Sequence, residues 1–321
     1  MNRDSKHPHS LHVTALALCL PLCASLYSSA GAVTVHSLDQ VRGAIKSPEG
    51  RATFDQQING APLPDGFGTQ LPQGFTKEML LAQLAPGQDP KRLTLAGAKP
   101  WPQQPQAYVA IVCLATSPDQ AKAELRYDPS SCSGDDITPH DVWLGVYTRD
   151  PQGKPRLVAR TEAPVDTPVD WGDTNIDTPQ SIGNNPQTGA AEGVPQNWLR
   201  FDFAAYRLHG QDYAFGVRAG WSEGYAGGGA TFEALYLFQM DDTKLHVVFA
   251  QPMMYTKMLA GEWHKDGTRD HIETDASNVL SVLKGTSHGF HDLRLQQRSG
   301  KWHRVFRWSA KQQRYAVVKN S

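Results

Sequence analysis

The sequence lacks a strong charge of either sign. Its 31 lysine and arginine residues nearly balance 32 aspartate and glutamate residues, and the formal net charge is −1. No block of lysines and arginines occurs along the chain. Proteins that bind nucleic acid draw affinity from clustered positive charge that neutralises phosphates. We therefore expect no nucleic-acid partner.

Long hydrophobic runs are also lacking after the first 32 residues. A helix that spans a membrane needs about 20 consecutive apolar residues. No later run approaches that length, so we expect no membrane span once the N-terminal segment is removed. Glycine and proline, with 28 and 22 copies, are by contrast somewhat abundant. They indicate many turns, which favours a mainly β chain over a helical bundle.

The N-terminus has the three parts of a secretory signal peptide, which we expect to span residues 1–32. Its charged start contains Arg3 and Lys6, its uncharged run covers residues 13–27, and residues 30–32 have the A-x-A form of a cleavage site. An uncleaved anchor is the alternative, but the run is shorter than the roughly 20 residues a span needs. The sequence thus predicts a periplasmic or secreted protein.

Cysteine is scarce, with four copies in all. Cys19 and Cys23 lie inside the predicted signal peptide, which leaves Cys113 and Cys132 in the mature chain. An even pair in an oxidising compartment predicts a disulfide. A pair of reactive or metal-binding thiols is the alternative, although the C-x-x-C spacing typical of such sites is missing.

Residues 33–106 are expected to form a helix-containing segment followed by a linker. An S-x-x-Q capping box at residues 37–40 predicts one helix, and apolar spacing predicts a second over 76–85. The proline-rich stretch 99–106 is typical of a linker or an extended arm. Residues 107–321 are expected to form an all-β domain, either an antiparallel sandwich or propeller-like meanders. Its strands are predicted at 107–115, 142–148, 156–162, 199–206, 213–219, 231–239, 244–251, 278–284, 290–298, 302–309 and 314–318.

The C-terminal stretch, residues 287–318, resembles meanders found at the ends of uncharacterised exported bacterial proteins. The resemblance is carried by residues 288–293 (HGFHDL), 306–308 (FRW) and 314–315 (RY). The stretch also resembles FG-GAP-type propeller repeats, but the calcium-binding D-x-D-x-D-G run of those repeats is missing. The resemblance implies a β architecture and no particular activity.

One catalytic candidate is Ser222, which lies in Gly220–Gly224, a match to G-x-S-x-G. In hydrolases that motif presents a serine nucleophile on a sharp turn from strand to helix. Asp270 and His288 follow in the order Ser, Asp, His. The residues after the motif are glycine-rich and then strand-like, so a tight hairpin is the competing interpretation.

A second candidate is the polar segment 262–275, which contains His264, Asp270 and His271. Imidazole and carboxylate groups together bind Zn²⁺ or serve as an acid–base pair. The segment has no fixed ligand spacing such as H-E-x-x-H, and a solvated loop between strands is the alternative.

The long loop 164–197 is a third candidate because it concentrates aspartates. Hard oxygen ligands on a loop suit Ca²⁺, although the spacing is not that of an EF-hand. A surface loop without metal is the alternative. The aspartates are Asp166, Asp170, Asp173 and Asp177.

Several tryptophans fall in or beside predicted loops, where exposed indoles stack on sugars or anchor protein partners. Core packing is the alternative. The tryptophans predicted to bind ligand are Trp171, Trp198, Trp221 and Trp263.

Together these patterns predict a non-catalytic exported protein that binds a glycan, a peptide or an envelope protein through its loops. A periplasmic hydrolase, metal-assisted around His264 and His271 or serine-based at Ser222, is one alternative, and a purely structural module stabilised by calcium is another. No cofactor is required by the sequence; Ca²⁺ at the loop and Zn²⁺ at the polar segment are the two that it suggests.

Overall fold

The computed structural model describes residues 40, 42–43, 65–128, 130–134, 138–186, 189–267 and 269–318, with the backbone alone at His271. The predicted signal peptide, residues 1–32, lies outside the described residues. The chain divides into two units after Leu63, and the fold below is that of the second unit.

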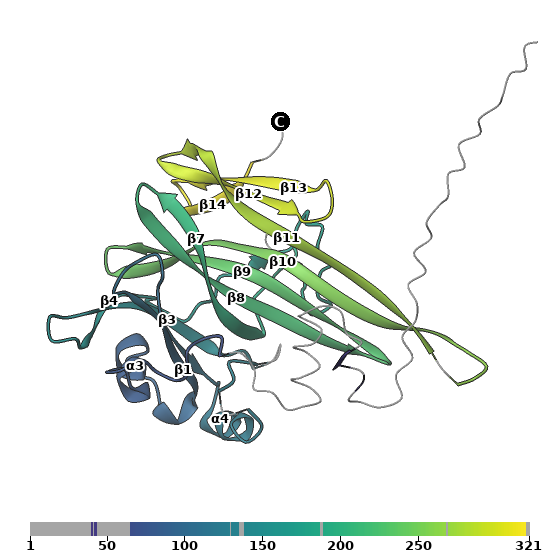
Figure 1. Ribbon diagram of the computed structural model, residues 1–321, viewed down its shortest axis with the longest axis horizontal. Helices are drawn as coiled ribbons and strands as arrows, with labels where there is room; N and C mark the ends of the chain where they lie inside the picture. Colours follow the sequence, from purple (N-terminus) through teal and green to yellow (C-terminus); the bar gives the residue numbers. More distant parts are fainter. Residues whose placement is uncertain are drawn as a thin grey trace, which may run out of the picture. The chain divides into compact units, whose positions relative to one another are not determined.

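The first sheet is an antiparallel meander of four strands with a helix on one face (Figure 1). Strands β2 and β3 are buried along nearly their whole length, because α3 covers one face and a second sheet covers the other. Burial on both faces explains why these strands are continuous apolar runs. The elements are α3 (Lys77–Leu84), η1 (Pro90–Arg92), β1 (Leu93–Pro100), β2 (Tyr108–Leu114), α4 (Pro118–Glu124), β3 (Asp141–Arg149) and β4 (Pro155–Arg160).

The second sheet is a meander of six long strands that closes on itself. Each strand pairs with the next in antiparallel fashion, and β12 returns to pair with β7 at Phe290 and His209. We call strands β7–β12 the closed sheet. Strand β4 joins it through a parallel pair with β10, between Arg160 and Lys244. The strands are β7 (Asn197–His209), β8 (Asp212–Tyr225), β9 (Gly228–Asp241), β10 (Lys244–Trp263), β11 (Arg269–Ser287) and β12 (Phe290–Gln297).

Short strands complete the architecture. Strands β13 (His303–Ser309) and β14 (Arg314–Val317) extend the sheet beyond β12. Strands β5 (Val169–Asp170) and β6 (Glu192–Gly193) form a separate pair within the long loop that precedes β7. None of the helices in the described part of the chain is long and apolar enough to cross a membrane.

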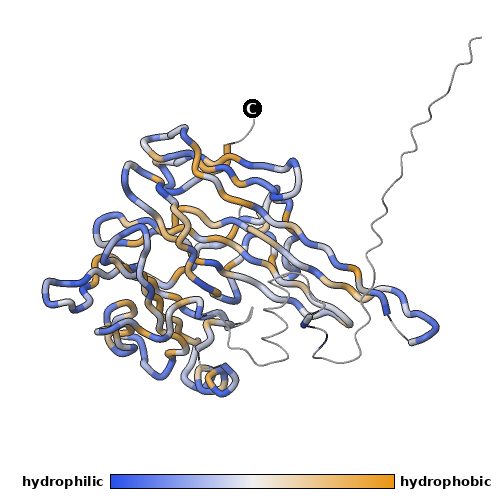
Figure 2. The backbone as a smooth tube through the Cα atoms, viewed as in Figure 1, coloured by the Kyte–Doolittle hydropathy of each residue, from blue (hydrophilic) through white to orange (hydrophobic). Residues whose placement is uncertain are grey.

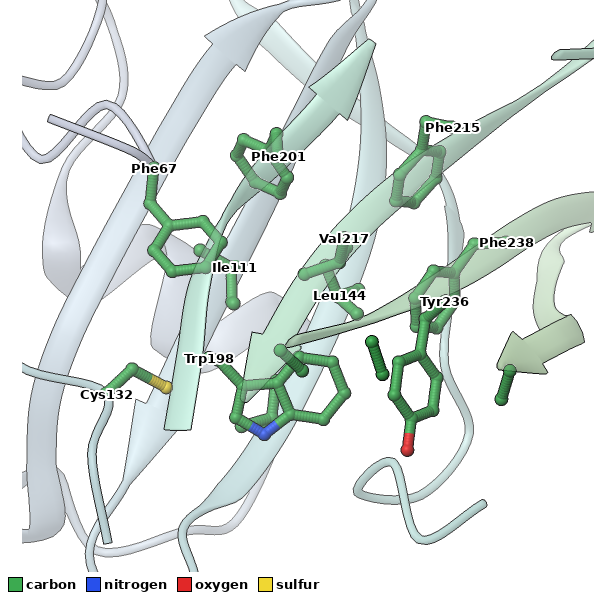
Figure 3. Packing of buried hydrophobic residues seen from close by; sticks show 14 of the residues in the cluster. Phe67, Ile111, Cys132, Leu144, Trp198, Phe201, Phe215, Val217, Tyr236 and Phe238 are labelled. Carbon is green, nitrogen blue, oxygen red and sulfur yellow. The ribbon is translucent and has the colours of Figure 1, made fainter. Parts of the chain in front are cut away.

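Alternating side chains on the closed sheet fill two hydrophobic clusters. Tyr236 and Phe238 of β9 point into the first cluster, between β1–β3 and β7–β10 (Figure 3). Leu235 and Leu237 of the same strand join the second cluster, which also contains residues of β12–β14 such as Phe306. Because the strand buries both faces, its sequence is apolar without strict alternation.

A disulfide joins Cys113 of β2 to Cys132, with 5.7 Å between the Cα atoms. Both cysteines are buried, and the carbonyl of Cys132 accepts a hydrogen bond from the backbone N–H of Trp198 in β7. The bridge therefore ties the segment after α4 to both sheets. The predicted disulfide is confirmed, and it indicates an oxidising compartment.

The mainly β fold, built from antiparallel meanders, is confirmed, and so is the helix expected over 76–85. The stretch expected to be a linker or an extended arm, 99–106, holds the end of β1 and the turn to β2. Strand β1 thus pairs with β2 across the boundary predicted at residue 106. Of the first predicted helix, residues 40, 42 and 43 are helical, and the rest lies outside the described residues.

Candidate functional site

A cavity of about 450 Å³ lies at one end of the closed sheet. In an antiparallel meander alternate turns meet at the same end, so the β7–β8, β9–β10, β11–β12 and β13–β14 turns gather here. We call the cavity the mouth pocket. It is lined by His209, Asp212, Gln239, Met240, Asp241, His246, Val248, Phe290, Trp308 and Gln313.

The turns around the mouth pocket have left-handed backbone conformations that tight hairpins require. His288 and Gly289 both have positive φ, at 52° and 85°, as does Asp242 at 53°. Hairpins with such turns follow the right-handed twist of their strands, so the strand ends stay paired up to the rim. The lining side chains therefore stand on paired strand ends or on short turns.

One wall of the mouth pocket is a column of flat side chains. The rings of Phe290 and Trp308 stack with centroids 3.8 Å apart and planes 9° apart. Phe290 also lies 4.7 Å from the His209 ring. The edge of Tyr315 packs against Trp308, and its hydroxyl donates to the carbonyl of His291. These contacts hold the aromatic wall in one orientation.

Burial changes the pKa of Tyr315, which packs against this wall. Desolvation, and next the nearby Asp292 carboxylate, raise the pKa of Tyr315 above its ordinary value. Tyr315 is therefore a neutral hydrogen-bond donor at every physiological pH. It supports the wall from behind and supplies no charge.

The remaining lining residues are rich in hydrogen-bond acceptors. Gln239 lies opposite His246 in the β9–β10 register, and Asp212 and Asp241 add two carboxylates. Among the residues the structure describes, the side-chain oxygen of Gln239 is buried and has no hydrogen-bond partner. Neither lysine nor arginine lines the pocket. The rim thus offers acceptors above an aromatic wall.

The pocket does not have the form of a metal centre. His209 Nδ1 lies 3.5 Å from Asp212 Oδ2, an exposed pair whose electrostatic energy is small. Within the described ranges, no group of three or more histidine, cysteine, aspartate or glutamate side chains is arranged to hold a metal ion.

Ser222 does not lie on a nucleophile turn. It is inside β8, opposite Thr231 of β9, and its backbone N–H faces the side-chain oxygen of Gln196 at 3.1 Å. Asp270 and His288 lie near opposite ends of β11, and a strand that rises roughly 3.3 Å per residue separates them by tens of ångströms. The predicted Ser–Asp–His arrangement is therefore wrong, and the hairpin interpretation of the glycines is confirmed by the β8–β9 turn.

His264 and Asp270 do meet, with 2.7 Å between Nε2 and Oδ1. They lie at the β10–β11 turn, and both side chains are about half exposed, at 49% and 60%. The third member of the predicted cluster, His271, is placed by its backbone opposite Ala260. The described geometry is that of an exposed hydrogen-bonded pair across a turn.

The aspartates of the long loop point to separate partners. Asp170 accepts from a backbone N–H two residues ahead. Asp173 lies 3.7 Å from Arg304, and Asp177 lies 3.5 Å from Lys257. Asp166 is exposed. The described structure thus does not assemble the calcium site expected at Asp166, Asp170, Asp173 and Asp177.

Three of the four tryptophans predicted to bind ligand are core residues. Trp171, Trp198 and Trp221 are at most 5% exposed, and the Trp171 and Trp221 rings meet edge to face at 5.2 Å. Their expected exposure is not found, and the core-packing alternative holds. Trp263 is 67% exposed, with the Arg269 guanidinium 5.1 Å from its ring centroid.

No protein-family model, no curated protein and no solved structure matches the chain.

Proposed function

We propose that the chain is an exported, non-catalytic protein that binds a glycan in the mouth pocket. The observation that carries this proposal is a cavity of about 450 Å³ with an aromatic wall and a rim of acceptors. Its volume falls in the range of about 300–1,000 Å³ that small-ligand sites occupy. Rigid paired strands position the lining on every side.

The lining suits a sugar because a sugar has two kinds of surface. Its C–H groups pack against apolar side chains, here the exposed parts of Phe290 and Trp308 together with Val248, while its hydroxyls donate hydrogen bonds. Asp241, Gln239 and His246 supply acceptors for those hydroxyls. After a small rotation of the Gln239 side chain, its unpartnered oxygen would accept a hydrogen bond from a sugar hydroxyl. That bond would remove the energetic cost of a buried polar atom without a partner.

The compartment supports the same proposal. The disulfide fits an oxidising environment, and the segment expected to be a signal peptide would deliver the chain to the periplasm or to the outside of the cell. Glycans of the envelope or the surroundings are ligands that such a compartment would present.

The test is a glycan-array screen of the disulfide-bonded protein, followed by calorimetry with each glycan that binds. Asp241→Asn should weaken binding by about 2 kcal/mol, roughly thirty-fold in Kd, because a charge-assisted hydrogen bond is lost. His246→Ala should weaken it by about 1 kcal/mol.

The matched controls are Asp166→Asn and His303→Ala, which make the same changes at exposed sites away from the mouth pocket. Both should bind like the unmodified protein. Equal losses in variants and controls, or an array without any binder, would contradict glycan binding. Cleavage of a bound glycan would contradict the non-catalytic assignment.

A further inference from the structure

The β10–β11 hairpin continues past the last pair between β9 and β10, which joins Gly229 to Met258 (Figure 1). Strand β11 pairs with β10 from Arg269 to Ser277 and with β12 only from Asn278 onward. Within the part of the chain that the structure describes, one side of β11 from 269 to 276 therefore carries no strand. We call this side the arm edge.

An unpaired edge is a template on which another extended chain can pair. Natural sheets block such edges with proline, bulges or a covering loop. The register of the arm is regular between residues 271 and 277 and shifts only near the tip, between Ala260 and Trp263 of β10. Ile272 is 56% exposed there, and Leu259, its partner on β10, is 37% exposed. The arm edge thus combines backbone N–H and C=O groups that face no neighbouring strand among the described residues with an exposed apolar pair.

The charges along the arm edge are mostly negative. Asp270, Glu273 and Asp275 are all exposed. The single arginine, Arg269, is directed back into the hairpin, where its guanidinium lies over Trp263 and its Nε donates to the carbonyl of Gly261 at 2.9 Å. A partner strand would therefore meet the carboxylates of Glu273 and Asp275, while the Asp270 carboxylate contacts His264 at 2.7 Å.

We propose that the arm edge binds an extended basic peptide, which adds to the sheet as a further antiparallel strand. Recognition by strand addition takes affinity from backbone hydrogen bonds and specificity from alternate side chains. The partner would carry basic residues opposite Asp275 and Glu273, with a polar residue between them. It would carry an apolar residue opposite Ile272.

A second copy of this chain is a poorer occupant on electrostatic grounds. Pairing two arm edges would place six carboxylates on one ribbon, since each edge contributes Asp270, Glu273 and Asp275. Like charges that face each other across strands destabilise the pairing. The arm edge also lies at the end of the closed sheet opposite the mouth pocket, because the β10–β11 turn follows strand β10 away from it. The two proposals can therefore be tested separately.

The experiment uses the full disulfide-bonded protein and a blocked, fluorescent peptide in which lysine alternates with threonine and valine. Binding is followed by fluorescence anisotropy, and hydrogen exchange of the backbone amides is followed by mass spectrometry. We expect saturable binding together with slower exchange across 269–276. A peptide with glutamate in place of lysine, and one with alternate N-methylated amides, should not bind.

The variant Glu273→Lys should weaken binding of the lysine peptide about five-fold and strengthen that of the glutamate peptide. Asp166→Lys, which makes the same charge change elsewhere, should leave both unchanged. Binding that leaves exchange at the arm edge unaltered would overturn the proposal, and so would a lack of binding. Protection that depends on protein concentration without any peptide would show self-pairing and would overturn it too.

Discussion

At the scale of single residues, Arg218 shows how the closed sheet accommodates charge among its strands. Its guanidinium, 18% exposed, bonds Asp202 at 2.6–2.7 Å and Glu233 at 3.3 Å. Burial works to lower the pKa of Arg218, but the two carboxylates outweigh it and hold the pKa above its ordinary value. Arg200 reaches the same oxygen of Glu233 at 2.8 Å. Each charged side chain of this network therefore keeps its partners only while every member is present.

Replacing Arg218 should therefore cost much more than replacing an exposed arginine. We expect Arg218→Met to lower the free energy of unfolding by about 3 kcal/mol, because Asp202 loses its cation in a largely buried position. Urea unfolding measures the change, with the exposed Arg156→Met as the matched control. The double variant Arg218→Met/Asp202→Asn should recover part of the loss. A change within about 0.5 kcal/mol of the control would contradict this account.

At the scale of elements, the sequence predicts those whose signals are local. Helix α3 is capped by Thr76, whose hydroxyl accepts from the Met79 N–H. In the sequence this cap is a threonine before a run with helical apolar spacing. Strand β1 escaped prediction because Ala96, Gly97 and Ala98 have little β propensity. They suit a strand only because neighbours pack closely: a Cβ at Gly97 would lie 2.5 Å from the carbonyl oxygen of Phe67.

The far half of the β10–β11 hairpin was missed for a related reason. Its residues are polar, as Figure 2 shows at the hairpin tip, and a polar segment is typical of a loop. The strands persist there because their backbones pair, from Met254 with Ser277 to Ala260 with His271 and, after a register shift, at Trp263 with Arg269. Backbone pairing of this kind leaves no signal in hydrophobic periodicity.

The disulfide gives an element-scale prediction. It closes a loop with a sequence separation of 19 that contains α4. Cys113→Ser/Cys132→Ser should lower the free energy of unfolding by about 3 kcal/mol on the chain-entropy model. Denaturant unfolding of the variant, and of the unmodified protein with reductant, should give matching curves. The unmodified protein should unfold at higher denaturant without reductant. Unchanged stability after complete reduction would contradict a structural role for the bridge.

At the scale of the whole molecule, closure of the sheet could not be read from the sequence. It depends on the pairing of β12 with β7, at Phe290 and His209, which are far apart in the chain. Periodicity identifies each strand but not its neighbours. The mouth pocket could not be predicted from the sequence for the same reason, because its lining comes from four turns that only the strand topology brings together. The sequence feature that points to the pocket is the presence of polar residues beside predicted turns, such as His246 after the turn at Asp242.

Since Phe290 both closes the sheet and forms the pocket wall, stability and binding should be linked through it. Phe290→Ala should lower the free energy of unfolding by about 2 kcal/mol, because the side chain is partly buried. It should also speed hydrogen exchange at the adjoining ends of β7 and β12 and abolish glycan binding. Phe203→Ala, partly buried in the first cluster, should destabilise similarly without either local effect. If exchange at the two strand ends were unchanged in Phe290→Ala, the closure would have to rest on contacts other than this aromatic column, and the wall of the pocket could move without opening the sheet.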